Sequence, residues 1–271
     1  MLKVRVIPTL LWKNVGLVKG IGFNSWRRIG TVMPAIKVHN TREVDELALM
    51  DITATQEGRA PDFESICEFS ADCFVPLTVG GGVKTTEDIR NMLRAGADKV
   101  SINSAAYANP ELVRQGANRF GAQCIVISID ARKMPGGRYE CFTHSGTRPT
   151  GREVGEWARQ AESLGAGEIL ITSIERDGAM LGYDLDLIQR VTESVNIPVI
   201  ASGGAGNYRH LLDAIQIGHA SAVAAASIFQ FTEQTPVEAK RFLAENGVAV
   251  RNRNVAVLSP PNFFIGDDGK R

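Results

Sequence analysis

The chain has 271 residues, of which 44% are hydrophobic and 22% are charged, so a sizeable core is expected and global disorder is excluded. Its 30 basic residues balance 30 acidic ones, and this balance favours neither nucleic acid nor a membrane surface as a partner. We see no leader-like segment and no apolar run near the roughly 18 residues of a membrane helix, and therefore expect a cytoplasmic protein.

Eight short runs rich in Val, Ile and Leu are expected to be strands, at residues 3–8, 46–52, 75–80, 99–103, 124–130, 168–174, 197–202 and 221–227. They are too uniformly apolar for half-exposed antiparallel strands and instead favour a parallel sheet covered by helices. Helical patterns alternate with them, as in "TTEDIRNMLRAGA" (85–97), where Thr85 and Asp88 have the spacing of a capping box. Eight such units predict a (β/α)8 TIM barrel.

We expect one domain over residues 1–251 and a loosely ordered C-terminal tail over 252–271, where prolines and a Gly/Asp/Lys run oppose helix and strand alike. Trp157 is expected in the core, whereas His39, His210 and His219 are expected at the surface or at helix ends. The four cysteines form no CxxC pair, so no metal or redox site is expected. No GxGxxG nucleotide-binding fingerprint follows a strand, so no cofactor is expected.

The chain also contains an internal repeat of about half its length. Residues 76–89 resemble 198–211 at an offset of 122, residues 50–55 align with 171–176 at an offset of 121, and Asn103 aligns with Ser227. A repeat of this length predicts two pseudo-symmetric half-barrels. The same offset, less about three residues, pairs Leu11 with Asp130.

Two glycine-rich turns follow strands at matching places in the repeat, "VGGG" (79–82) and "SGGAGN" (202–207). Glycine lets the backbone come close to a ligand, and free N–H groups at a helix start attract anions. The next strands end at Asn103–Ser104 and Ala226–Ser227, which add side-chain donors. Tight turns alone would also explain the glycines, but two turns in register favour a long substrate with a phosphate at each end. A bulky residue at Gly82 or Gly204 is expected to weaken phosphate binding without unfolding the barrel.

The motifs "LMDITAT", "PLTVGGGV", "RAGADKVSIN", "THSGTRPTG", "LGAGEILITSIERDG" and "IPVIASGGAGN" closely resemble the cyclase subunit of imidazole glycerol phosphate synthase, and the likeness runs from about residue 3 to 251. The resemblance implies a lyase-type barrel that forms a heterodimer with a glutaminase subunit. Such a barrel receives ammonia from that glutaminase, adds it to a bis-phosphorylated aminoimidazole precursor and closes the imidazole ring.

The resemblance also implies residue roles. Asp130 matches one of the two catalytic acids of the family. The residues matched to substrate or phosphate binding are Lys19, Asp51, Gly82, Asn103, Asp177, Gly178, Gly204 and Ser227. The residues matched to a charged gate at the closed end of the barrel, where ammonia enters, are Arg5, Glu46, Lys99 and Glu168. Asp98 matches the glutaminase-docking surface. Because buried charges must be paired, the four gate residues are expected to bind one another.

The chain departs from the family at the first strand, where the pattern IPxLD is replaced by "IPTLL" and the second catalytic acid becomes Leu11. Leucine cannot donate or accept a proton. A branch of the family that shares this departure resembles the chain in "LLxKNxGLVKG", "REVDEL" and "EGRAPDF", and is associated with amidation of surface-sugar precursors of the O-antigen type. It converts an acetamido group to an acetamidino group with glutaminase-derived ammonia.

Three interpretations remain open. The first is an ammonia-using synthase subunit of this family that amidates a sugar substrate. The second is the cyclase of histidine biosynthesis, with Thr9, Asp51 or Asp177 in place of the lost acid. The third is a catalytically silent barrel that activates a glutaminase, against which the retained Asp130 and glycine turns argue. The sister isomerase of histidine synthesis, also a two-phosphate barrel, is disfavoured by the gate residues.

Overall fold

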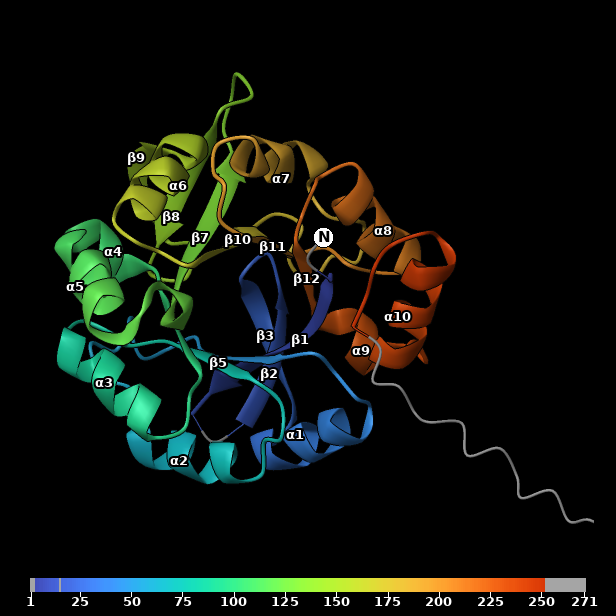
Figure 1. Ribbon diagram of the computed structural model, residues 1–271, viewed down its shortest axis with the longest axis horizontal. Coiled ribbons are helices and arrows are strands. Elements are labelled where there is room, and N and C mark those ends of the chain that lie inside the picture. Colours follow the sequence, from blue (N-terminus) through green and yellow to red (C-terminus); the bar gives the residue numbers. More distant parts are fainter. Residues whose placement is uncertain (1–2, 15, 252–271) are drawn as a thin grey trace, which may run out of the picture.

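The computed structural model describes residues 3–14 and 16–251, and these form a closed barrel of eight parallel strands surrounded by helices (Figure 1). The barrel strands are β1 (Arg5–Lys13), β4 (Leu47–Asp51), β5 (Leu77–Gly80), β6 (Lys99–Ile102), β7 (Ile125–Lys133), β10 (Glu168–Ser173), β11 (Val199–Ser202) and β12 (Ala222–Ala225). β12 pairs with β1 in parallel and closes the ring. All eight predicted strands and the predicted (β/α)8 fold are confirmed.

The helices cover the outside of this ring, and one short 3-10 helix, η1 (Ala122–Cys124), precedes β7. They are α1 (Val32–Thr41), α2 (Phe63–Ala71), α3 (Thr86–Arg94), α4 (Ser104–Ala108), α5 (Glu111–Phe120), α6 (Val154–Ser163), α7 (Leu185–Thr192), α8 (Tyr208–Gln216), α9 (Ser227–Phe231) and α10 (Pro236–Glu245). The predicted capping box of α3 is present, with Thr85 and Asp88 each bonding the backbone of the other. None of the described helices is long and apolar enough to cross a membrane.

Two antiparallel hairpins, which the sequence did not predict, extend the first strand of each half. β2 (Gly16–Ile21) and β3 (Asn24–Gly30) continue from β1, while β8 (Tyr139–Thr143) and β9 (Arg148–Glu153) continue from β7. The order of elements therefore repeats: a strand with a hairpin, three further strand–helix units, and a short helix (α4 or α9) before the last long one. This order matches the predicted half-barrel repeat.

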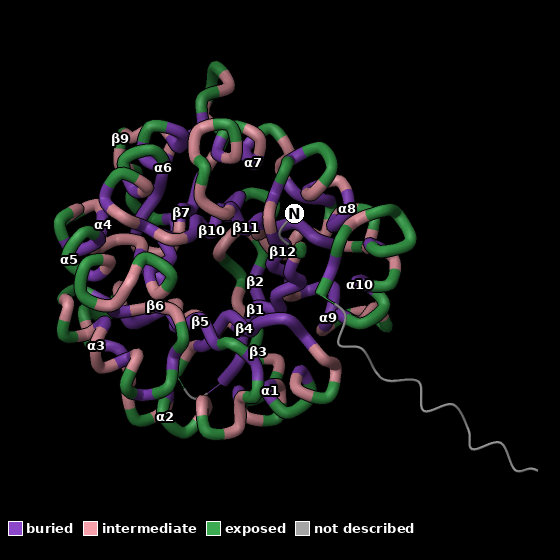
Figure 2. The backbone as a smooth tube through the Cα atoms, viewed as in Figure 1, coloured by how far each residue is buried: buried purple, intermediate pink, exposed green. Residues whose placement is uncertain are grey.

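The core has two parts. The larger lies between the strands and the helices and includes the fully buried Trp157, as predicted. The smaller lies inside the barrel and consists of Ile7, Ala48, Val126, Leu170, Ile200, Ala222 and Ala224. Figure 2 shows the buried strands at the centre and the exposed segments on the outer helices. The predicted C-terminal tail, 252–271, lies outside the described residues.

Candidate functional site

A cavity of about 530 Å³ opens at the end of the barrel where the strands finish, the end that carries the active sites of TIM-barrel enzymes. Its floor includes Leu170 and Ala224 of the inner core. Every residue that the sequence matched to catalysis or substrate binding lines this cavity: Lys19, Asp51, Gly82, Asn103, Asp130, Asp177, Gly178, Gly204 and Ser227. Leu11 lines it as well.

Asp130 lies in β7 and is only 9% exposed. Burial is the larger cause, and the negative charge of Asp177 the smaller, of a rise in the pKa of the Asp130 carboxyl group from 3.8 to about 7. A hydrogen bond from Asn103 favours the charged form and acts in the opposite direction. The Asn103 Nδ2 donates that bond to Asp130 Oδ2 over 2.8 Å. A carboxyl group with a pKa near 7 can both give and take a proton at neutral pH, as a general acid–base catalyst must.

Lys19 and Asp177 form the second part of the charged site. Lys19 comes from β2 and is 4% exposed. Burial lowers the pKa of its amine to about 8, and the charge of Asp177 partly offsets this. Burial likewise raises the pKa of Asp177, with Lys19 acting in the opposite direction. Gly22, at the tip of the β2–β3 hairpin, donates its backbone N–H to the Asp177 carbonyl oxygen over 2.9 Å, so the hairpin that carries Lys19 is fixed over the barrel mouth.

Both glycine turns place two successive glycines at positive φ. Gly81 and Gly82 have φ of +114° and +76°, and Gly203 and Gly204 have φ of +84° and +116°. A Cβ on Gly81 would meet the Asp51 carbonyl oxygen, and one on Gly203 would meet that of Ser173. Asp51 in the first half therefore corresponds to Ser173 in the second, which is an offset of 122 residues. The alignment of 50–55 with 171–176 assumed an offset of 121 and was wrong by one residue.

The expectation that Gly204 tolerates a bulky residue does not hold. A Cβ at Gly204 would lie 2.2 Å from the Gly182 carbonyl oxygen, and its φ of +116° strains any other residue. At Gly82 the nearest atoms, including the Arg59 carbonyl oxygen, would lie at 3.0 Å. A loss of phosphate binding in such variants would therefore not separate ligand contacts from folding.

Polar atoms remain free to receive a ligand in the cavity. The Thr9 hydroxyl and the Asn103 Oδ1 are buried and have no hydrogen-bond partner among the described residues. Buried polar groups are seldom left unpaired, so both are suited to a polar substrate. Ser227, at the start of α9, also faces the cavity and is 7% exposed.

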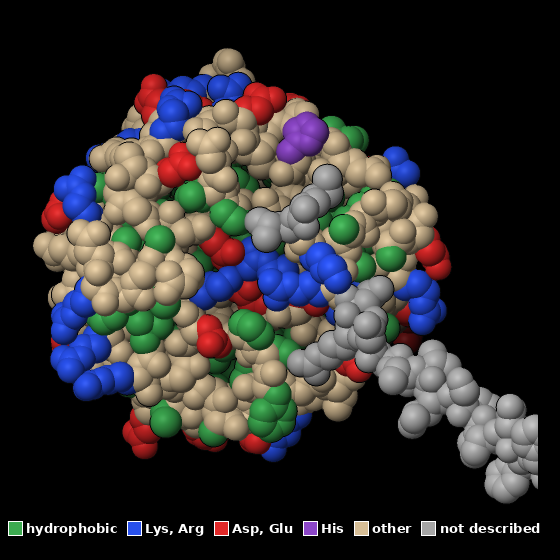
Figure 3. All heavy atoms as spheres, viewed as in Figure 1, with side chains coloured by type: hydrophobic (Ala, Val, Ile, Leu, Met, Phe, Trp, Pro, Cys, Tyr) green, Lys and Arg blue, Asp and Glu red, His purple; other side chains and the backbone are tan. Residues whose placement is uncertain are grey.

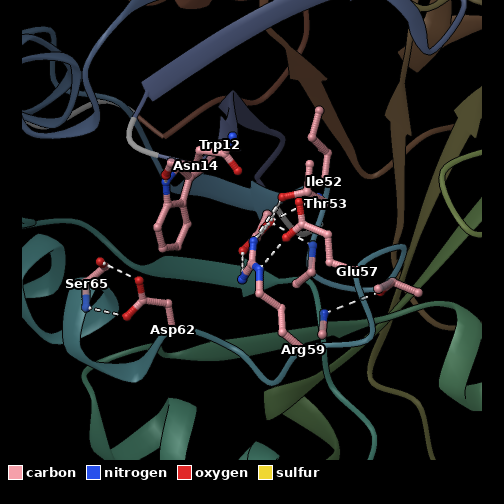
Figure 4. Close-up of polar contacts among 12 residues, drawn as sticks. Trp12, Asn14, Ile52, Thr53, Glu57, Arg59, Asp62 and Ser65 are labelled. Carbon is pink, nitrogen blue, oxygen red and sulfur yellow. Dashed lines mark hydrogen bonds and ion pairs between the residues drawn. The ribbon is translucent and has the colours of Figure 1, made fainter.

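Asp51 has a different role from the one expected of an active-site acid. Its Oδ1 accepts hydrogen bonds from the backbone N–H groups of Thr53 and Ala54 and from Arg59, whose Nη1 lies 2.7 Å from Oδ2. Figure 4 shows Arg59 and Glu57 close together in the loop after β4, and Arg59 Nε donates to Glu57 over 2.7 Å. The carboxylate of Asp51 is thus occupied in shaping the loop after β4, next to the first glycine turn.

The sequence did not predict Arg59 or the contacts of the β8–β9 turn, where His144 was interpreted as a loop histidine rather than a site residue. His144 lines the cavity at this turn, and its backbone N–H donates to the Ser104 hydroxyl over 3.0 Å. Ser145 donates to the Ile52 carbonyl oxygen over 2.9 Å. Burial and the nearby Arg148 lower the pKa of His144, which favours a neutral ring. No local signal reveals these contacts, because each joins segments far apart in the chain.

The four predicted gate residues lie at the opposite end of the barrel, where the strands begin, and they form a closed ring of ion pairs. Arg5 binds Glu46 and Glu168 at 2.7 Å each, and Lys99 binds the same two at 2.9 and 2.8 Å. Burial alone would raise the pKa of Glu46, but Lys99 and Arg5 outweigh it and lower that pKa. Figure 3 shows Lys and Arg side chains, with acidic ones beside them, near the centre of the barrel end it displays.

Asp98 also lies away from the cavity, in the loop that precedes β6. It is exposed, and its Oδ2 accepts a hydrogen bond of 2.8 Å from the Leu77 backbone N–H. Among the residues that the structure describes, no group of three His, Cys, Asp or Glu side chains is arranged to hold a metal ion.

Comparison with protein families gives a match to the family model described as "Histidine biosynthesis protein", over residues 5–235. The chain belongs to this family. The match covers most of the chain, including the eight barrel strands, the cavity and the ring of ion pairs formed by Arg5, Glu46, Lys99 and Glu168, which we call the gate ring. Membership in the family implies a barrel enzyme of the histidine-biosynthesis type.

Proposed function

We propose that this protein is the synthase subunit of a glutamine amidotransferase complex. In this proposal it uses ammonia from a glutaminase partner to convert the acetamido group of a phosphorylated sugar to an acetamidino group, for surface polysaccharide synthesis. The observation that carries the proposal is the difference in side-chain chemistry between Asp130 and Leu11, which occupy matching positions in the two halves. One wall of the cavity offers an acid tuned near neutrality, and the matching position in the other half offers a hydrocarbon.

The barrel interior supports a route for ammonia. The four gate residues lie at the end where the strands begin, and between them and the cavity lies the inner core, which is entirely apolar: Ile7, Ala48, Val126, Leu170, Ile200, Ala222 and Ala224. Neutral ammonia crosses an apolar passage more easily than ammonium, because burying a charge is costly. The gate residues also match those that admit ammonia in the family that the sequence resembles.

The surface around Asp98 supports a protein partner at the same end. Phe74 is 74% exposed in the loop that leads into β5, and Asp98 is bonded to Leu77 at the start of that strand. Exposed aromatic side chains and exposed carboxylates at the same end of a fold are typical of interface anchors and their polar rim. We assign this surface to the glutaminase.

The amidation chemistry needs one acid–base group. Ammonia adds to the acetamido carbonyl carbon, a C–N bond forms, and the carbonyl oxygen takes up protons and leaves as water, so amide and ammonia yield amidine and water with no change of oxidation state. Asp130, with a pKa of about 7, can donate a proton to the departing oxygen and recover one from the new nitrogen. Leu11 has no part in this proton transfer.

The histidine-pathway cyclase is the second candidate, favoured by the family match and by Asp177. Of the three residues considered as replacements for the lost acid, Thr9 is not an acid and Asp51 is held by Arg59 and two backbone N–H groups. Asp177 lines the cavity close enough to raise the pKa of Asp130, and it is the replacement that the geometry favours. A silent barrel is disfavoured, because it would not need a buried, perturbed Asp130.

The test is an amidation assay on the purified chain, with acetamido nucleotide sugars and ammonium chloride in place of the partner. Mass spectrometry follows the replacement of oxygen by NH. We expect product from the wild type and a loss of about 10²–10⁴-fold in Asp130→Asn. Lys133→Met, an exposed residue at the end of the same strand, is the matched control. The proposal would be excluded if no acetamido sugar gave product while the same protein showed cyclase activity.

A further inference from the structure

Three positions of the cavity wall that correspond in register differ in polarity between the two halves of the barrel. In the first half, Leu11 pairs with Met50 and Met50 pairs with Gly80 on neighbouring strands. We call these three residues the apolar row. In the second half, Asp130 pairs with Thr172 and Thr172 pairs with Ser202. We call these three the polar row. All six residues line the cavity.

The apolar row is accessible from the cavity, although Met50 also packs against the inner core. Leu11 and Met50 are each half-buried, although their strands are otherwise almost entirely buried over the barrel length. A Cβ on Gly80 would lie 2.8 Å from the Met50 sulfur, so the Met50 side chain extends over this glycine. Phe23 and Trp26, from the β2–β3 hairpin, add aromatic surface to the same cavity.

An apolar surface facing a polar one suits a ligand that is apolar on one side and reactive on the other. A pocket gains affinity by removing apolar ligand surface from water, so a methyl group gains from contact with leucine and methionine, whereas a phosphate does not. The polar row, with its carboxyl and two hydroxyl groups, suits the group that exchanges protons and hydrogen bonds. The two rows together fix which way such a ligand lies.

We propose that the apolar row binds the methyl group of the substrate's acetamido substituent and so turns the acetamido carbonyl group toward Asp130. This proposal rests on the proposed function and goes beyond it, because it makes Leu11 a specificity-determining residue. Leu11, which stands in place of the second acid, then contributes to substrate recognition. The acid that it replaces is not needed for amidation. A substituent without the methyl group loses the contact with the apolar row.

The test measures equilibrium binding, which does not depend on turnover or on the partner. The probes are N-acetylglucosamine 1-phosphate, its N-formyl analogue and inorganic phosphate, each titrated calorimetrically into the full chain. One methyl group in an apolar pocket changes affinity by about tenfold or more. We expect the wild type to bind the N-acetyl probe about tenfold more tightly than the N-formyl probe.

The decisive variant is Leu11→Asn, similar in size but polar, with Leu11→Ala as a second variant in case the first folds poorly. Both are expected to bring the ratio of the two sugar affinities close to one while inorganic phosphate binds as in the wild type. Thr172→Val, a change of the reverse polarity in the polar row, is the matched control and should keep the wild-type ratio. Both probes retain the carbonyl group that faces this row.

Two outcomes would overturn the proposal in distinguishable ways. Equal affinity of the wild type for the two sugar probes, or an unchanged ratio in both Leu11 variants, would overturn the methyl subsite and leave the amidation function standing. Binding of inorganic phosphate without binding of either sugar phosphate would remove the sugar function and this inference with it.

Discussion

The side-chain amide of Asn103 donates a hydrogen bond of 2.8 Å to the Asp130 carboxylate, although the two residues belong to different strand–helix units. Three influences set the pKa of Asp130: burial and Asp177 raise it, and Asn103 lowers it. Because burial raises the pKa above its ordinary value, the protonated form persists up to about pH 7 and is lost as the pH rises through that value.

This balance predicts opposite pH shifts in two variants. Asp177→Asn removes a negative charge and should move the fall in kcat/KM to lower pH, because Asp130 then loses its proton more easily. Asn103→Ala removes a bond to the charged form and should move that fall to higher pH. A pH profile of ammonium-dependent activity measures both. If the two variants shift in the same direction, the assignment of this titration to Asp130 is wrong.

The gate ring predicts a large difference between two Lys→Met changes. Lys99→Met leaves Glu46 and Glu168 buried with one cation between them and should lower the free energy of unfolding by about 3 kcal/mol. Lys37→Met breaks an exposed pair with Asp72 and should cost less than about 1 kcal/mol. Urea denaturation of both variants measures the difference, and equal costs would contradict the buried ring.

Two glycine variants should separate strain from steric conflict. Gly204→Ala combines a positive φ with a 2.2 Å approach to the Gly182 carbonyl oxygen. Gly136→Ala has a similar positive φ of +89° but no atom within 4 Å. Gly136→Ala should lower the free energy of unfolding by about 1 kcal/mol through backbone strain alone, and Gly204→Ala should lower it clearly more. Thermal denaturation provides the comparison; a Gly204→Ala protein as stable as Gly136→Ala would show that the turn can relax.

Phosphate binding at the second glycine turn is better tested through Ser227. Its hydroxyl faces the cavity at the start of α9, and removing it does not disturb the glycine backbone. Ser227→Ala should weaken binding of a sugar phosphate several-fold, as expected for one hydrogen bond of about 1–2 kcal/mol to a charged group. Ser163→Ala, at an exposed position of α6, is the control. Identical affinities in the two variants would remove Ser227 from the phosphate site.

Local pattern was sufficient for the barrel and for part of the site. The eight strands were predictable because each is a continuous apolar run, and the start of α3 was predictable from its capping residues. The glycine turns and Asn103 were predictable because strands of a parallel barrel end at one face, so strand-end residues meet there. The gate ring and Lys19 came from the resemblance alone.

The remainder has no signal in the local sequence pattern. β3 is largely exposed and has no apolar alternation, so the β2–β3 hairpin gave no strand signal. His39 does lie in the last turn of α1, yet it is buried, and burial lowers its pKa to about 4. The pairing of Arg59 with Asp51 changes the role of that acid, and only the folded loop after β4 reveals it.

The central claim is that a cavity with Leu11 at the position of the second catalytic acid does not close an imidazole ring. The most direct measurement is a cyclase assay of the wild type with the bis-phosphorylated aminoimidazole precursor of histidine synthesis and saturating ammonium. The claim predicts no turnover by a folded protein that still binds the precursor through its phosphates. Turnover with kcat on the order of 1 s⁻¹ or more would show that Leu11 is compatible with ring closure and that the protein is a cyclase of histidine biosynthesis.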